Sequence, residues 1–458
     1  MHSKAILSTF TVALLTSTSV MAADAILPGS SVLPIIEEAP LFALTIEGGV
    51  TAFDIPDTDG VGYTDLEGPL FEGLDDALLG GTIGVEFSAP LNADGAALNG
   101  SAFYSYATRS GSESRAFTDE RLIVLHGPSL PSGVIDLYTL DLDDQPVGTF
   151  VGDLGDASGT AIPGAAIGAV NAVAVIEPVA DFADGADGFA FAGAVGDGQT
   201  FAFGTIASDE GTIFVGYGEL LGWEVSNEVT QNLTYAGGDI TFSQSTAPGD
   251  VVDFTAYIGP SLRYMGTETT TETSVTPNQY AYPDIEYATF SISTVENIDT
   301  YYGGVVFGGS VGFDLWGGSN LTLDLGAGAY YANSSYGSAT DATLIGGDGN
   351  RNELASSSLD LDDVDGFAYT VKAGSTFSAP IGESLQLNFG LGAEYMSRVA
   401  TSRFIGSDGV SNNDAGGTGD DIGGNDVVYN SDDAVGGTVL SFGDGWSYKA
   451  TVGLTGQF

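Results

Sequence analysis

The feature that most constrains the fold is an alternation of apolar and polar side chains with a period of two residues. In the last segment of the chain, Trp446, Tyr448 and Val452 share one parity, whereas Lys449 and Thr451 share the other. This period is typical of a β-strand whose two faces meet different surroundings. The pattern recurs in ten segments, which span residues 41–53, 81–91, 98–109, 229–245, 251–265, 301–316, 320–332, 367–381, 384–399 and 446–458.

The charged residues of these segments share one face. In the segment 229–245 the parity changes at Gly237 and Gly238, where we expect a β-bulge, so this segment is set aside. The other nine segments place every charge opposite the apolar stripe. A basic residue facing lipid near the membrane midplane costs about 2–4 kcal/mol, so a charge-free apolar face predicts a membrane on that side. We expect a lumen charge network formed by Glu47, Glu86, Arg109, Asp253, Arg263, Asp314, Asp324, Lys372, Glu394, Arg398 and Lys449.

The connections between the segments alternate in length, which indicates how the strands are joined. Brief connections at 92–97, 246–250, 317–319 and 382–383 alternate with long polar ones at 54–80, 110–228, 266–300, 333–366 and 400–445. Short periplasmic turns and long external loops are typical of outer-membrane barrels. We therefore predict an all-β chain, a transmembrane antiparallel up-and-down β-barrel of about ten strands, with about eight to twelve allowed, and long acidic external loops.

A water-soluble β-sandwich also alternates apolar and polar residues, and it is the main alternative fold. A sandwich does not require aromatic residues at its strand ends, whereas a membrane barrel has aromatic girdles there. The residues that favour the barrel are Tyr106, Tyr264, Trp316, Tyr331, Tyr395, Trp446 and Phe458.

The first residues have the composition of an export signal. Lys4 precedes an apolar run at 5–15, and Val20-Met21-Ala22 forms a small-residue cleavage site, so we predict a signal peptide at 1–22 that is cleaved after Ala22. Residues 23–40 are predicted to form a periplasmic lead-in, and residues 41–458 the barrel. The inserted region 110–228 is too long for a plain connection. It is interpreted either as an external β-rich subdomain or as a source of another strand pair that makes the barrel twelve-stranded.

The charge of the chain excludes one class of partner. It has 61 acidic and 10 basic residues, a net charge of −51, and no cysteine. This field repels nucleic acid, and we interpret the acidic excess as solvated surface loops. Two hard-oxygen clusters are weak candidates for Ca²⁺, although neither has full EF-hand spacing. We expect no tightly bound cofactor; loose Ca²⁺ or Mg²⁺ association would involve Asp360, Asp362, Asp365, Asp420, Asp421 and Asp426.

His126 is the one histidine that follows the signal peptide. The surrounding residues 122–128 predict a short strand that enters a turn. No nucleophile motif accompanies the histidine, so we expect a structural role for it and no enzymatic activity.

The last dozen residues resemble the assembly signal of Gram-negative outer-membrane β-barrel proteins, including small porin-like ones. The matching positions are Tyr448, Val452, Leu454 and the terminal Phe458, whereas Gly456 departs from the bulky residue usual at its position. The resemblance implies an outer-membrane location, recognition by the barrel-insertion machinery, and contact with outer-membrane lipid and lipopolysaccharide.

The expected bore is narrow, because a barrel of about ten strands lies close to the size that side chains fill. The predicted lumen network has nearly balanced charge, which indicates ion pairing rather than a selective ring. We therefore expect a porin-like or structural protein with narrow or no conductance. The alternative is surface adhesion or ligand binding through the region 110–228.

Overall fold

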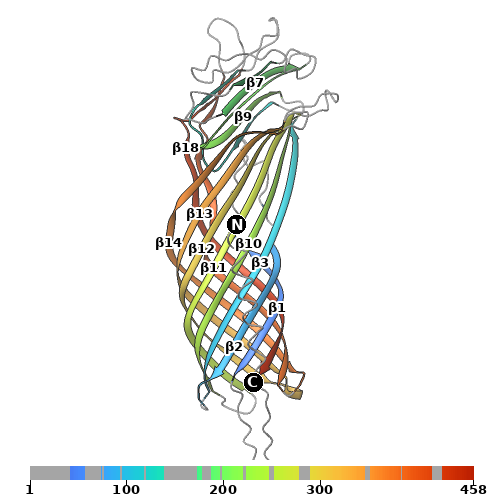
Figure 1. Ribbon diagram of the computed structural model, residues 1–458, viewed down its shortest axis with the longest axis vertical. Helices are drawn as coiled ribbons and strands as arrows, with labels where there is room; N and C mark the ends of the chain where they lie inside the picture. Colours follow the sequence, from blue (N-terminus) through green and yellow to red (C-terminus); the bar gives the residue numbers. More distant parts are fainter. Residues whose placement is uncertain are drawn as a thin grey trace, which may run out of the picture. The chain divides into compact units, whose positions relative to one another are not determined.

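Ten strands close into an antiparallel barrel, as predicted from the alternating segments (Figure 1). The computed structural model describes residues 42–56, 74, 77–92, 95–117, 120–138, 173–177, 187–195, 199–219, 223–246, 252–277, 289–345, 351–382, 384–414 and 425–458. The barrel strands are β1 (Ala43–Asp54), β2 (Leu78–Pro90), β3 (Ala96–Phe117), β10 (Trp223–Thr246), β11 (Val252–Pro277), β12 (Thr289–Asp314), β13 (Asn320–Ile345), β14 (Arg351–Pro380), β15 (Leu385–Ser407) and β18 (Val435–Gln457).

Each strand pairs with its successor in this series, and β18 closes the ring on β1. The closure extends to the last residue, because the backbone N–H of Phe458 donates to the carbonyl of Phe42 at 3.0 Å. The connection between β12 and β13 lies at the same end of the barrel and contains the short 3-10 turn Trp316–Gly318, where Gly317 and Gly318 have positive φ. Glycine is favoured there because a side chain disfavours that backbone conformation. We call this end the turn end and the opposite end the loop end.

The described parts of the expected loops 266–300 and 333–366 are barrel strand, as are the ends of the expected loops 110–228 and 400–445, so the predicted strands were too short. β11 runs on to Pro277, β12 begins at Thr289 and β13 continues to Ile345. The extensions lack an outward apolar stripe, and this stripe was the signal used to predict strands. They are hydrogen-bonded to their neighbours in the same way as the membrane portion.

The predicted bulge at Gly237 and Gly238 is wrong. β10 pairs with β11 in one unbroken register, with Gly237 opposite Arg263 and Gly238 opposite Leu262. The apolar residues of β10 nevertheless change parity, because Leu233 and Tyr235 are buried inside the barrel whereas Ile240 and Phe242 are exposed on its outer face. The change of parity reports a change of surroundings and not an irregular backbone.

The region between β3 and β10 adds a separate sheet and no barrel strand. Its order is β4 (Glu120–His126), β9 (Gly211–Glu219), β8 (Gln199–Ser208), β7 (Asp187–Val195) and β6 (Val173–Glu177). A further sheet joins β16 (Val410–Asp414), β17 (Asn425–Asn430) and β5 (Val134–Tyr138). We call these two sheets the head. Of the two interpretations of the region 110–228, the structure has the separate β-rich unit and a ten-stranded ring.

Three clusters of buried apolar residues lie inside the barrel and beneath the head. The first, which we call the plug, consists of Phe53, Ile55, Leu78, Ala107, Leu233, Tyr235, Met265, Tyr302, Val306, Tyr330, Ala332, Ala368, Met396 and Val399. The second joins Ile298, Tyr336 and Ala400. The third packs Ile123, Leu125 and Phe214 of the head against Phe290 and Ile292 of β12, so the five-stranded sheet shares a core with the barrel strands.

Candidate functional site: the barrel bore

The bore is identified by contacts between strands that are not neighbours in the ring. The Tyr235 hydroxyl of β10 donates to Glu394 Oε2 of β15 at 3.2 Å. The Tyr302 hydroxyl of β12 donates to the carbonyl of Arg398, also in β15, at 2.7 Å. Such contacts cross the interior, so these side chains point inward.

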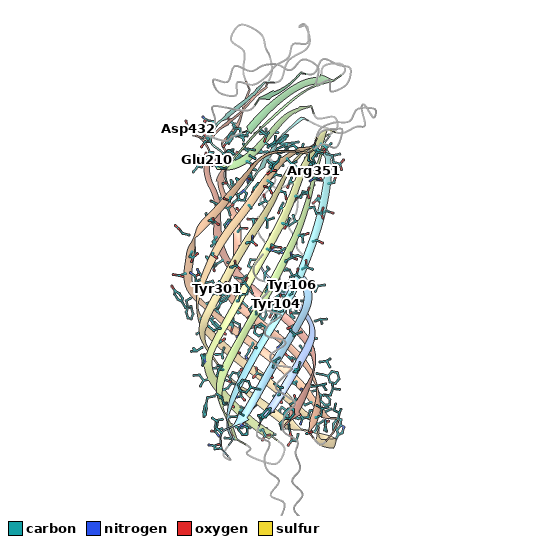
Figure 2. The ribbon with its side chains drawn as sticks, viewed as in Figure 1. Tyr104, Tyr106, Glu210, Tyr301, Arg351 and Asp432 are labelled. Carbon is teal, nitrogen blue, oxygen red and sulfur yellow. The ribbon has the colours of Figure 1, made fainter. Side chains whose placement is uncertain are left out.

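The outer face carries an apolar belt that begins at the turn end. Its members include Ile46, Ile83, Ile258, Leu325 and Leu391, all of which are exposed. Aromatic side chains end the belt partway along the barrel, where Figure 2 places Tyr104, Tyr106 and Tyr301 at a similar level. An apolar outer band bordered by aromatic residues is the pattern of a membrane-spanning barrel.

Near the turn end the bore is polar and open to water. Lys449 Nζ lies 3.6 Å from Glu47 Oε1, with side chains that are 51% and 21% exposed. The Thr451 hydroxyl donates to the other Glu47 oxygen at 3.0 Å. Partly hydrated pairs of this kind contribute little to stability.

The other predicted bore residues of this part lie close by. The Tyr257 hydroxyl donates to Asp324 Oδ1 at 3.4 Å, and Lys372 Nζ lies 5.3 Å from the centre of the Tyr257 ring. Glu86 is exposed to the space inside the barrel, near the Glu47 and Lys449 charges. The two remaining members, Asp253 and Asp314, are exposed at the turn end, where Asp314 Oδ1 accepts from Asn320 at 3.4 Å.

Farther along the bore, Arg263 forms a buried ion pair with a residue that the sequence argument left out. Arg263 Nη1 lies 2.7 Å from Asp239 Oδ1, and Nη2 lies 3.0 Å from Oδ2. The two side chains are only 3% and 11% exposed. Two parallel N–H···O bonds make a bidentate pair, which is the strongest geometry for arginine and a carboxylate. Asp239 lies in the segment 229–245, where the change of parity at Gly237 and Gly238 hides which residues face inward.

The plug lies beside this pair inside the barrel. Every barrel strand except β18 contributes to it, and Tyr302, Tyr330 and Phe53 are among the largest fully buried side chains of the described residues. The Tyr302 and Tyr330 rings meet edge to face at 6.4 Å, and Ser261 shares a hydrogen bond of 2.9 Å with Tyr330. The alternating pattern does not predict this plug, because it assigns polar side chains to the inward positions.

Three of the predicted network members lie at or beyond the plug. Glu394 contacts Tyr235 as described. Arg109 Nε donates to Gln231 Oε1 at 2.7 Å, close to the loop-end side of the plug. Arg398 lies between β14 and β15, where its Nη2 donates to the Asp365 carbonyl at 3.1 Å. The eleven residues are therefore divided along the bore: those near the turn end share a hydrated compartment, Arg263 and Glu394 lie at the plug, and Arg109 and Arg398 lie farther toward the loop end.

Beyond the plug, Glu296 is a buried carboxyl that the sequence argument also missed. It is 2% exposed, and it accepts a hydrogen bond of 2.8 Å from the Tyr336 hydroxyl. Burial raises the pKa of Glu296 above its ordinary value, although the hydrogen bond from Tyr336 opposes the shift. Glu296 lies in the expected loop 266–300, for which no inward-facing residues were predicted.

His126 lies at the end of β4, as expected, and is completely enclosed. Its Nδ1 lies 2.9 Å from the Gly127 carbonyl, and its ring lies 4.2 Å from the Phe404 ring. Burial lowers the pKa of His126, while the Gly127 carbonyl and Asp408 act in the opposite direction. Pro128, two residues after His126, accepts from the backbone N–H of Thr438 at 3.1 Å, so this part of the chain contacts β18.

The candidate metal ligands do not assemble in the part of the chain that the structure describes. Asp360, Asp362 and Asp365 lie along β14 with exposed side chains. Asp420 and Asp421 fall outside the described residues, as does the side chain of Asp426. No group of three potential ligands occurs among the described residues. No helix in that part of the chain is long and apolar enough to cross a membrane.

The residues of the resembled assembly signal all face outward. Tyr448, Val452 and Leu454 of β18 belong to the exposed apolar belt. Phe458 is also exposed and stacks on Phe42 with ring centres 5.0 Å apart. The predicted signal peptide 1–22 and the lead-in 23–40 fall outside the described residues.

Fold and belt together define the class of protein: a β-barrel of the outer-membrane type. No protein-family model and no curated sequence matches the chain. Among solved structures it is similar to the outer-membrane protease OmpT of Escherichia coli, with 7% identity, a TM-score of 0.28, and coverage of 91% of this chain and 96% of that one. A FadL homologue of Pseudomonas aeruginosa is 9% identical, with a TM-score of 0.17 and coverage of 91% of this chain and 90% of that one. An anion-selective porin of Comamonas acidovorans is 10% identical, with a TM-score of 0.15 and coverage of 91% of this chain and 98% of that one. At these values the likeness carries no argument about this chain.

Proposed function

We propose that this chain is an outer-membrane β-barrel protein of a Gram-negative bacterium with a structural role and with little or no conductance along its bore. The observation that carries the proposal is the plug, in which nine strands direct buried side chains into a narrow barrel. An apolar constriction excludes hydrated ions because it offers them no polar partners. The hydrated compartment at the turn end then ends blindly at Tyr302 and Tyr330.

Planar-bilayer recording of the purified protein tests this proposal. The expected result is insertion without stable stepwise currents. Long-lived, ohmic current steps from the wild-type protein would instead favour a porin-like function, and their reversal potential in a salt gradient would give the ion selectivity.

The cellular setting belongs to the same proposal. The signal peptide would direct export and be removed by cleavage after Ala22, and insertion by the barrel machinery would use the outward-facing terminal strand that ends at Phe458. Outer-membrane lipid would contact the apolar belt. Lipopolysaccharide would lie near the acidic loop end, where Ca²⁺ or Mg²⁺ would associate loosely and no resident cofactor is needed.

Surface adhesion or ligand binding through the head is the second candidate. It is favoured by the shared core, in which Phe214 of the head stacks on Phe290 of β12 with ring centres 4.9 Å apart. A head fixed to the barrel in this way is presented rigidly. Mild proteolysis of intact cells separates the candidates, because loss of cell adhesion without any change in permeability favours the binding role.

We also propose that the protein is not an enzyme. The support comes from His126, whose ring nitrogen faces a backbone carbonyl and whose ring is enclosed beside Phe404. A general base must reach a substrate proton, directly or through one water molecule. Hydrolysis of a peptide or ester substrate that disappears in a His126→Gln variant would contradict this part of the proposal.

A further inference from the structure

The barrel wall contains a seam between β14 and β15. These strands are hydrogen-bonded only between the pairs Thr370–Met396 and Pro380–Gln386. Toward the loop end, β14 continues to Arg351 in pairing with β13, and β15 continues to Ser407 in pairing with β18. Among the described residues no backbone ladder joins the two strands there. In Figure 1 the upper part of β18 rises apart from the sheet that contains β14.

Side chains hold the seam together where the ladder ends. A register shift between Met396 and Val399 leaves Ser397 and Arg398 outside the pairing with β18. The Ser397 hydroxyl accepts from the Tyr369 backbone N–H at 2.9 Å. Arg398 donates to the Asp365 carbonyl, as described above, and its guanidinium lies 3.7 Å from the centre of the Phe442 ring.

Gly366 gives the Arg398 guanidinium its space, because a Cβ at this position would overlap the Arg398 side chain. Lysine is not a conservative replacement for arginine in a stacked, hydrogen-bonded position, because it lacks the planar guanidinium that makes both interactions at once. Arg398 therefore acts as a latch between a free edge of β14 and the β15–β18 pair.

A small cavity adjoins the latch, because Met396 and Val399, the residues on either side of the register shift, both line it. It is lined by Phe53, Ile55, Tyr235, Met265, Glu394 and Met396, and it reaches Trp446 on β18. Met265 and Met396 are the only methionines of the chain after Met21. Methionine side chains are flexible and fill irregular space, so a cavity with two of them adapts readily to an occupant.

Glu394 is the one carboxyl-bearing residue among those that surround this apolar cavity, and its oxygens are covered while the latch is closed. Its Oε2 accepts from Tyr235, whereas its buried Oε1 has no hydrogen-bond partner. A buried carboxylate oxygen without a donor is costly, and a ligand that supplies the donor recovers that cost. An ammonium group is suited to this position because it carries both the donor and the compensating charge.

We propose that the seam is a lateral entrance, latched by Arg398, to a binding site for a small amphipathic ammonium compound. The apolar part of the ligand lies among Phe53, Met265 and Met396, and its ammonium group donates to Glu394 Oε1. Aromatic residues flank the entrance on the outer face, with Tyr369 and Tyr395 ring centres 5.7 Å apart and Tyr395 and Trp446 5.2 Å apart. In the latched state the cavity has room for about one water molecule, so entry requires the seam to open and the methionines to move.

Thiol labelling measures access to this cavity, because the chain has no cysteine of its own. A Met396→Cys variant in detergent is treated with an ammonium-bearing methanethiosulfonate and, separately, with its sulfonate counterpart. We expect Arg398→Ala to accelerate both reactions about tenfold, the scale of losing a hydrogen bond from a charged group. Arg398→Lys serves the same purpose if the alanine variant does not show the heat-modifiable mobility of a folded barrel.

Charge preference and location are read in the same assay. The ammonium reagent should react faster than the sulfonate reagent, and Glu394→Gln should remove that preference. A Val306→Cys control, buried in the plug away from the cavity lining, should stay unreactive with and without Arg398→Ala. The proposal would be overturned if Met396→Cys is labelled at the same rate with and without Arg398→Ala, or if it shows no preference between the two reagents. It would also be overturned if Arg398→Ala accelerates the labelling of Val306→Cys equally.

Binding is tested without any introduced cysteine by titrating hexylammonium chloride and recording tryptophan fluorescence, since Trp446 lines the cavity. We expect a saturable change in the wild-type protein that Glu394→Gln abolishes and Glu86→Gln preserves. The same change in the Glu394→Gln variant would show partition into detergent and would contradict the site. These outcomes are independent of whether the bore conducts ions along its axis.

Discussion

The two halves of the barrel bury opposite faces of the same strands. Toward the turn end, Ile240 of β10 is 57% exposed on the outer face, whereas toward the loop end Tyr235 of the same strand is 3% exposed inside. β12 behaves alike, with Val305 and Phe307 outside and Ile292 and Ile298 inside. The backbone register is continuous through the change. The face of a strand that carries its apolar residues therefore shows where its apolar surroundings lie. Toward the turn end these surroundings are lipid outside the barrel, and toward the loop end they are a packed core inside it.

The same division separates two kinds of ion pair. Lys449 and Glu47 lie in the hydrated compartment, where solvent screens their attraction. Arg263 and Asp239 lie against the plug, where desolvation makes each charge dependent on the other. Paired substitutions in the two compartments therefore measure how different they are.

The largest effect is expected for Asp239→Ala. Removing one partner of a buried pair leaves the other charge uncompensated, which costs about 3–5 kcal/mol of unfolding free energy. The matched change Glu47→Ala should cost less than about 1 kcal/mol, because its partner remains hydrated. Urea unfolding in lipid vesicles gives both values. Equal losses for the two variants would show that the compartments do not differ in hydration.

This comparison also explains what could be predicted from the sequence. The ring of ten strands and the outward stripe followed from residues such as Leu387 and Val452, because lipid demands a continuous apolar face. The plug and the Arg263–Asp239 pair could not be predicted. Leu233 and Tyr235 have the opposite apolar parity to the rest of β10, and the sequence pattern of such a change is the same as that of a β-bulge. The strand extensions were missed for a related reason: residues such as Thr267, Thr269 and Thr271 face the inside without an apolar partner stripe outside.

Glu296→Gln should raise the free energy of unfolding, because it removes a buried carboxyl from the loop-end half of the barrel. Burial raises the pKa of Glu296, so the wild-type carboxyl reduces stability as pH rises above its ordinary value of 4.5. Glutamine keeps an acceptor for the Tyr336 hydroxyl and has no charge to bury. We expect a gain on the order of 1 kcal/mol at neutral pH, the scale of one buried polar group.

The gain from Glu296→Gln should disappear as pH falls below 4.5, where the wild-type carboxyl becomes protonated in both the folded and unfolded states. Glu272→Gln, an exposed change on β11, is the control and should have no such pH dependence. A stabilisation that is the same at every pH would remove burial of the carboxyl as its cause.

A smaller effect is expected where the head meets β15. Burial lowers the pKa of His126 below its ordinary value of 6.5, so the unfolded chain takes up the proton first as pH falls. Stability of the head should therefore be complete above that value and decline below it. Proteolysis of the head at about pH 7.5 and about pH 5.5 should show less acid sensitivity in His126→Phe, which cannot titrate, than in the wild type. Equal acid sensitivity in the two proteins would assign the effect to the carboxylates.

Single-channel recording of plug variants tests the central claim most directly, namely that aromatic side chains and not charges close the bore. Tyr302→Ala combined with Tyr330→Ala removes the two rings that meet in the plug, while Tyr257→Ala removes a ring from the hydrated compartment. The account predicts stable current steps from the folded double variant, and none from the wild-type protein or from Tyr257→Ala. Currents of equal size in all three proteins, or a folded double variant that stays closed, would contradict it.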